Sequence, residues 1–152
     1  MKSNIKINNK MKTPNLKLIT LFTALTLFVG TFTSCSDDDG PVVNITVNEG
    51  PNGDIGGDFT GDGGSGSRII SWTNNLATAD YNADITASQS GTFQMVVADA
   101  NATVVLDRTL TGGTEPDTID GVTNTGEPGT WTVTITLTSF NGDGSYSLSE
   151  GD

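Results

Sequence analysis

Residues 130–140 place the strongest constraint on the fold of this chain, because threonine alternates with apolar side chains from residue 130 to residue 138. In a β-strand successive side chains point to opposite faces, so this alternation predicts a strand with one buried and one solvated face. Threonine is β-branched and suits the solvated face. The apolar face comprises Trp131, Val133, Ile135 and Leu137.

Shorter segments elsewhere show the same period of two. In residues 91–98 the side chains of Phe93, Met95 and Val97 share a face. In residues 103–110 the shared face holds Val104, Leu106 and Leu110, although Arg108 interrupts this apolar set. Further strands are predicted at residues 69–72, 83–87, 118–122 and 145–148, whereas residues 74–81 fit either a turn or one turn of helix.

Turn sequences separate these strands, at residues 99–102 and at the Asn-Gly-Asp-Gly sequence of residues 141–144. Such short strands, joined by Gly and Asx turns, are typical of an antiparallel β-sandwich. We therefore predict an all-β, jelly-roll-like sandwich of about 6–8 strands. The predicted core is Trp72, Phe93, Met95, Leu106, Leu110, Trp131, Val133, Ile135, Leu137, Phe140 and Tyr146.

The N-terminal part has a different character, with five lysines, an apolar run at residues 18–32 and then Cys35, the one cysteine of the chain. A basic region, a short apolar region and small residues before a cysteine resemble a bacterial lipoprotein signal peptide. The resemblance implies cleavage after residue 34 and acylation of Cys35, with membrane binding through the acyl chains. Translation starting at Met11 would give a leader of more usual length.

Four residues after the leader carry a second resemblance: Ser36, Asp37, Asp38 and Asp39 are similar to the acidic surface-export signal of lipoproteins in a group of Gram-negative bacteria. This similarity implies an outer-membrane lipoprotein exposed at the cell surface. Residues 35–68 are predicted to be a lipidated N-terminus and a flexible Gly/Asp-rich tether, in which residues 41–47 could add one short strand. The predicted division is therefore 1–34 signal peptide, 35–68 tether and 69–152 β-sandwich domain.

Composition narrows the possible functions. After Cys35 the chain holds two arginines against 18 carboxylates, a formal charge of −16, which repels nucleic acid and anionic headgroups. Histidine is absent throughout, and lysine is absent after Cys35, so the common nucleophile–base pairs and Schiff-base chemistry are excluded. With Cys35 acylated no disulfide forms. We predict a chain that is not an enzyme.

Residues 99–148 also resemble jelly-roll accessory domains of exported bacterial proteins. The shared features are the Asp99 turn, the apolar 104–106 segment, the Gly-Thr-Trp-Thr-Val sequence of residues 129–133 and the 141–144 turn. Examples are the P-domain of subtilisin-like proteases and the pre-peptidase C-terminal domain. The resemblance implies a module that assists folding, attachment or substrate contact.

Two turns offer oxygen ligands for calcium, which prefers carboxylate, amide and carbonyl oxygens. Asp99, Asn101 and Asp107 lie around the first turn, and Asn141 and Asp143 lie in the second. Turn geometry alone also explains Asx and Gly at these positions, so both interpretations stay open. Calcium is the only cofactor that the sequence suggests.

Other candidates concern glycans. Trp72 and Tyr81 are predicted to be the aromatic side chains freest to stack on a sugar, although core packing also explains them. Thr118, between Asp117 and Ile119, resembles an O-glycan acceptor of the same bacterial group. We predict a lipid-anchored binding or structural module of the envelope; a calcium-dependent or carbohydrate-binding adhesion module is the alternative. Its partner would be a glycan or an envelope protein.

Overall fold

The structure, a computed structural model, describes residues 40–50 and 53–151. These residues form eight β-strands whose pairings are all antiparallel, which confirms the predicted all-β class. The described part includes no helix long and apolar enough to span a bilayer. The strands are β1 (Val43–Ile45), β2 (Asn48–Glu49), β3 (Ile55–Asn74), β4 (Ala79–Thr86), β5 (Thr92–Ala98), β6 (Val104–Thr111), β7 (Thr118–Val122) and β8 (Gly129–Glu150).

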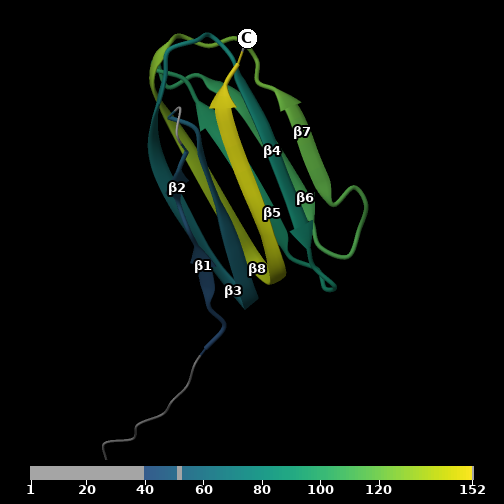
Figure 1. Ribbon diagram of the computed structural model, residues 1–152. Helices are drawn as coiled ribbons and strands as arrows, with labels where there is room; N and C mark the ends of the chain where they lie inside the picture. The colour runs from purple at the N-terminus through teal and green to yellow at the C-terminus, as the bar shows by residue number, and fades with distance from the viewer. Residues whose placement is uncertain (1–39, 51–52, 152) are drawn as a thin grey trace, which may run out of the picture. The chain divides into compact units, whose positions relative to one another are not determined.

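Two long strands, β3 and β8, run through both layers of the sandwich (Figure 1). Residues 132–138 of β8 pair with β5, whereas residues 143–150 pair with β4. β3 follows β8 through both halves. One layer therefore has the order β6–β5–β8–β3, and the other has the order β7–β4–β8–β3, followed by β1 and β2.

Both long strands pass between the layers at the end where β1 begins, the lower end in Figure 1. The β3–β8 register shifts twice between Asp62 and Gly66. On β8, Ser139 has φ 46° and Gly142 has φ 151°. Glycine adopts such a conformation without a Cβ penalty. The predicted turn at residues 141–144 is thus wrong in one respect, because β8 bends there and continues, held by its pairing with β3.

All eleven predicted core residues are buried. Trp72 and Trp131 pack edge to face with ring centroids 6.0 Å apart, and Phe59 stacks on Phe93 at 4.7 Å. Val104, predicted to face the core, is 55% exposed, while Val105 is buried. The register shift between Val97 and Ala98 explains this difference, since a bulge moves neighbouring side chains to the opposite face.

The structure corrects the interpretation of residues 43–68 as a flexible tether. They form β1, β2 and the first part of β3, and Ile55 and Phe59 lie in the core. Gly57 shows why glycine is needed here, because a Cβ at this position would overlap the Thr46 carbonyl oxygen. The glycines permit close approach of neighbouring strands, so their abundance does not indicate disorder in this segment.

Candidate functional site

A groove opens where the edges of the two layers face each other, between β6 and β7. Its volume is about 310 Å³. We call it the edge groove, and its lining includes Tyr81, Val104, Leu106, Arg108, Val122 and Asn124. Val104 and Val122 are more than half exposed, so apolar surface is present at the groove. The groove thus combines apolar surface with three side chains that can donate hydrogen bonds.

Arg108 enters the groove because of its position on an edge strand. It pairs with Met95 across β5 and β6, and Met95 is fully buried, so both side chains point to the core-facing side. The Arg108 side chain is exposed, and no ion pair or side-chain hydrogen bond among the described residues involves it. Its neighbour Asp107 points to the opposite face, where its Oδ1 accepts a hydrogen bond from Gln94 Nε2 at 2.8 Å. The guanidinium therefore keeps its donors available.

Tyr81 reaches the groove from the other layer. Its side chain is 7% exposed, and β4 places its ring on the core-facing side beside Ala79 and Ala83. The phenolic hydroxyl has no hydrogen-bond partner within residues 40–50 and 53–151. In the described part no buried side-chain nitrogen or oxygen atom lacks a partner, so this hydroxyl opens to solvent at the groove. A largely buried ring whose unbonded hydroxyl opens onto a groove is the feature of this surface most suggestive of a binding site.

Residues 123–128 border the groove at the end far from β1. Asn124 N donates to the Val105 carbonyl at 3.0 Å, which fixes this segment against β6. Asp99 holds the same segment, because its Oδ2 accepts from Glu127 N at 2.9 Å and its Oδ1 accepts from the amides of Asn101 and Thr103. Backbone hydrogen bonds, from Glu127 first and then Thr103, lower the pKa of Asp99. This carboxylate has a structural role.

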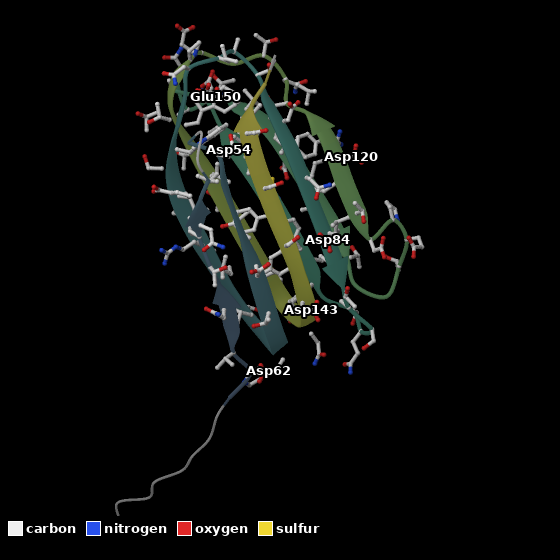
Figure 2. All side chains as sticks on the ribbon, viewed as in Figure 1. Asp54, Asp62, Asp84, Asp120, Asp143 and Glu150 are labelled. Carbon is white, nitrogen blue, oxygen red and sulfur yellow. The ribbon has the colours of Figure 1, made fainter. Side chains whose placement is uncertain are left out.

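The five residues suggested as calcium ligands do not form one site. Asp99 and Asn101 lie in the β5–β6 turn, Asp107 lies within β6, and Asn141 and Asp143 lie on β8 at the opposite end. No group of three or more acidic, histidine or cysteine side chains in the described part is arranged to hold a metal. Figure 2 shows its labelled carboxylates, from Asp62 and Asp143 to Glu150, spread along the sandwich.

The aromatic side chains do not provide a sugar-stacking platform. Trp72 and Tyr81, predicted to be the freest pair, are both buried, and Trp72 Nε1 donates to the Gly53 carbonyl at 2.8 Å. In fact all seven aromatic residues in the described part are buried. They pack in the core because large aromatic side chains bury the most apolar surface.

The remaining predicted sites stay predictions. Thr118 is exposed at the start of β7, and its Oγ1 lies 3.3 Å from Asp117 Oδ1. Cys35 and the Ser36–Asp39 export signal lie outside the described residues. Sequence reasoning did not identify the edge groove, although the interruption of an apolar strand face by Arg108 was its available signal.

The fold defines the class of this protein as an antiparallel β-sandwich module. No protein-family model matches the chain, and the search of curated proteins found no match. The resemblance of residues 99–148 to P-domains and pre-peptidase C-terminal domains therefore stays a prediction.

Two solved structures show a distant structural resemblance. An arabinose-bound MgGH51 α-L-arabinofuranosidase aligns with 72% of this chain at 12% identity and a TM-score of 0.39. This chain spans only 22% of that enzyme. A CBM4 structure aligns with 74% of this chain and 92% of its own length, at 14% identity and a TM-score of 0.35.

Proposed function

We propose that this protein is a non-catalytic binding module, anchored to the outer membrane through acylated Cys35, and that the edge groove is its ligand site. The observation that carries the proposal is the unused hydroxyl of Tyr81, a nearly buried side chain, in the same groove as the unpaired Arg108. Both groups are hydrogen-bond donors without a partner in the described part of the chain. Both groups are open to solvent, and a polar ligand would offer them fixed acceptors in place of water.

The position of β1 supports an arrangement in which the edge groove faces away from the membrane. β1 begins at Val43, beside the bends of β3 and β8, and Val42 N donates to Asp62 Oδ1 at 2.5 Å. The chain from Cys35 to Val42 spans at most roughly 25 Å, at about 3.3–3.6 Å per residue. An anchored domain would therefore keep this end near the bilayer, while Val104 and Asn124 lie toward the other end.

Carbohydrate is the ligand class that the groove favours over calcium. Hydroxyl, amide and guanidinium groups donate hydrogen bonds to sugar oxygens, whereas a calcium site needs several oxygen ligands around one point. Since the described aromatic residues are buried, recognition would depend on hydrogen bonds and on contacts with Val104 and Val122. The calcium-dependent module stays an alternative that the same experiment tests.

Thermal denaturation of a soluble chain of residues 36–152 tests the proposal, because that chain retains all eight strands and the whole core. Polysaccharides and calcium are the added ligands. A ligand at 100 times its Kd should stabilise the fold by about 2.7 kcal/mol, which raises the Tm by several degrees. Arg108→Gln should abolish the shift.

Arg68→Gln is the matched control, since Arg68 also lies on an edge strand and is distant from the edge groove. A cooperative melt that no ligand shifts would refute the binding function. A shift that Arg108→Gln leaves unchanged would place the ligand elsewhere. A shift with calcium alone would support the calcium-dependent alternative.

A further inference from the structure

Arg108 is the positively charged side chain that lines the edge groove. Among the described residues 14 carboxylates surround two arginines, yet Arg108 pairs with none of them. Its planar fork of donors matches a carboxylate, which it can bind through two parallel hydrogen bonds. Tyr81 and Asn124 add an uncharged hydroxyl and an amide to the same groove. The lining also includes Asp107, whose carboxylate accepts a hydrogen bond from Gln94 Nε2 on the opposite face of β6. The core-facing side of the groove therefore suits one anionic group at Arg108, with neutral polar groups beside it.

Resting on the proposed function, we infer that the edge groove binds a carboxylate-bearing sugar residue. Arg108 pairs with the sugar carboxylate, and Tyr81 and Asn124 bond its hydroxyl or ring oxygens. Val104 and Val122 contact the C–H surface of the ring. The groove volume of about 310 Å³ is at the lower end of the range for small-molecule sites, about 300–1,000 Å³, and fits one or two sugar residues.

The charge of the rest of the domain argues against densely charged polymers. A formal charge of −16 after Cys35 repels a polyanion over distances of about 8–10 Å at physiological salt. A nucleic acid or a heavily sulfated chain would meet this repulsion along its whole length. In a glycan with isolated carboxylates, only the carboxylate beside Arg108 is repelled, and the positive charge of Arg108 compensates for that repulsion.

An extended peptide fits the groove less well than a compact sugar. Strand addition needs a continuous row of free backbone groups on an edge strand. On β6 the Val105 carbonyl already accepts from Asn124 N, which interrupts that row. An inward-pointing charge on an edge strand, such as Arg108, is also a common means of preventing strand addition.

Amide chemical shifts of the soluble chain, measured during titration with the methyl glycosides of galacturonate and mannuronate, which carry one carboxylate each, test this inference. The methyl esters of the same glycosides are the neutral counterparts. We expect perturbed amides along residues 104–108 and 122–124 and binding of the acids that is about tenfold or more tighter than that of the esters, since hydrogen bonds to charged groups are the stronger ones.

Arg108→Gln should remove this preference for the acid, and Arg108→Lys should retain part of it, because lysine keeps the charge without the fork. Arg68→Gln should change the affinity less than about twofold, as expected for a surface change outside the site. Thermal melts of all three variants check that each one remains folded.

Three other outcomes would each overturn part of the proposal. Equal binding of acids and esters in the groove would overturn the carboxylate inference and leave the binding function intact. Perturbation of the groove by an acidic peptide, but by none of the sugars, would overturn the sugar inference alone. If no ligand perturbs these amides, both the inference and the proposed groove function fail.

Discussion

The two open sides of the sandwich carry the same pair of side chains with different surroundings. On each side an arginine lies at a core-facing position of an edge strand, Arg68 on β3 and Arg108 on β6, and a tyrosine points inward from the other layer. The Tyr146 hydroxyl donates to the Thr46 carbonyl at 2.8 Å, whereas the Tyr81 hydroxyl has no partner in the described residues.

The difference arises from the N-terminal segment. β1 and β2 extend one layer beyond β3, and the residues between them bring the Thr46 carbonyl to Tyr146. Gly57 leaves room for this carbonyl. On the Arg108 side the corresponding layer ends at β7, and no further described strand pairs with it. On the first side the chain thus supplies the acceptor, whereas on the second side the hydroxyl stays open to solvent.

The largest effect should come from the core that supports both sides. Trp131 is fully buried, contacts Trp72 and donates from Nε1 to the Glu127 carbonyl at 2.8 Å. Trp131→Ala should reduce the free energy of unfolding by about 3–5 kcal/mol, because it leaves a cavity. Denaturant melts measure this, and Thr132→Ala on the solvated face is the control. Equal melts for the two variants would contradict the core position of Trp131.

Removing the hydroxyl of Tyr146 or of Tyr81 tests the difference between the two sides directly. Tyr146→Phe removes the hydrogen bond to the half-buried Thr46 carbonyl, and we expect a loss of about 0.5–1.5 kcal/mol, the usual net contribution of one hydrogen bond. Tyr81→Phe removes an unbonded hydroxyl, so the melt should change by less than about 0.5 kcal/mol. Equal losses in the two variants would show that the Tyr81 hydroxyl has a structural partner and would remove the basis of the proposed site.

The sequence predicted those parts of the fold in which the type of each side chain indicates whether it is buried or exposed. The alternation in residues 130–138 identified the core-facing side of β8, and the apolar positions of β5 identified its buried face. The segment at residues 43–68 could not be predicted in this way. Its glycines carry no side-chain pattern, and their place in β3 depends on pairing with β8, which is more than 70 residues away in sequence.

The candidate site was unpredictable for a related reason. A strand pattern shows that Arg108 interrupts an apolar face, but it does not show whether the strand lies at an edge or in the centre of a sheet. Tyr81 comes from a different layer, and only the packed structure brings it to the same groove. Trp72 and Tyr81 were expected to be the freer aromatics because sequence gives no measure of how completely a small core uses its large side chains.

Asp99 provides a test that is specific to the Arg108 side. Its lowered pKa means that its hydrogen bonds to the Glu127, Thr103 and Asn101 amides stabilise the folded state above pH about 4, the unfolded value, and are lost as pH falls through the folded pKa. Asp99→Asn should therefore lower the free energy of unfolding at neutral pH and make that free energy less sensitive to acid. The effect should be smaller than that of Trp131→Ala.

Hydrogen exchange locates this effect. In Asp99→Asn the Glu127 amide should exchange faster, because Asp99 Oδ2 is its acceptor, while amides of β1 should keep their rates. Faster exchange on both sides of the sandwich would show that Asp99 stabilises the whole domain and does not act on the segment that borders the edge groove.

The smallest expected effect concerns the two arginines. Burial raises the pKa of Tyr146, and the positive charge of Arg68 opposes this rise. Arg68→Gln should therefore raise the pKa of Tyr146 further, whereas Arg108→Gln should leave it unchanged. With the Tyr81→Phe change present in each protein, Tyr146 is the only tyrosine left, so the tyrosinate absorbance band reports it alone.

Circular dichroism on the same samples separates this titration from unfolding. Because the folded pKa is raised, Tyr146 contributes stability that is complete below pH about 10 and is lost as pH rises through the folded value. Arg68→Gln should move the absorbance midpoint upward and Arg108→Gln should not. Equal movement with both variants would mean that the two arginines act on Tyr146 through the general charge of the domain, and the local difference between the two sides would disappear.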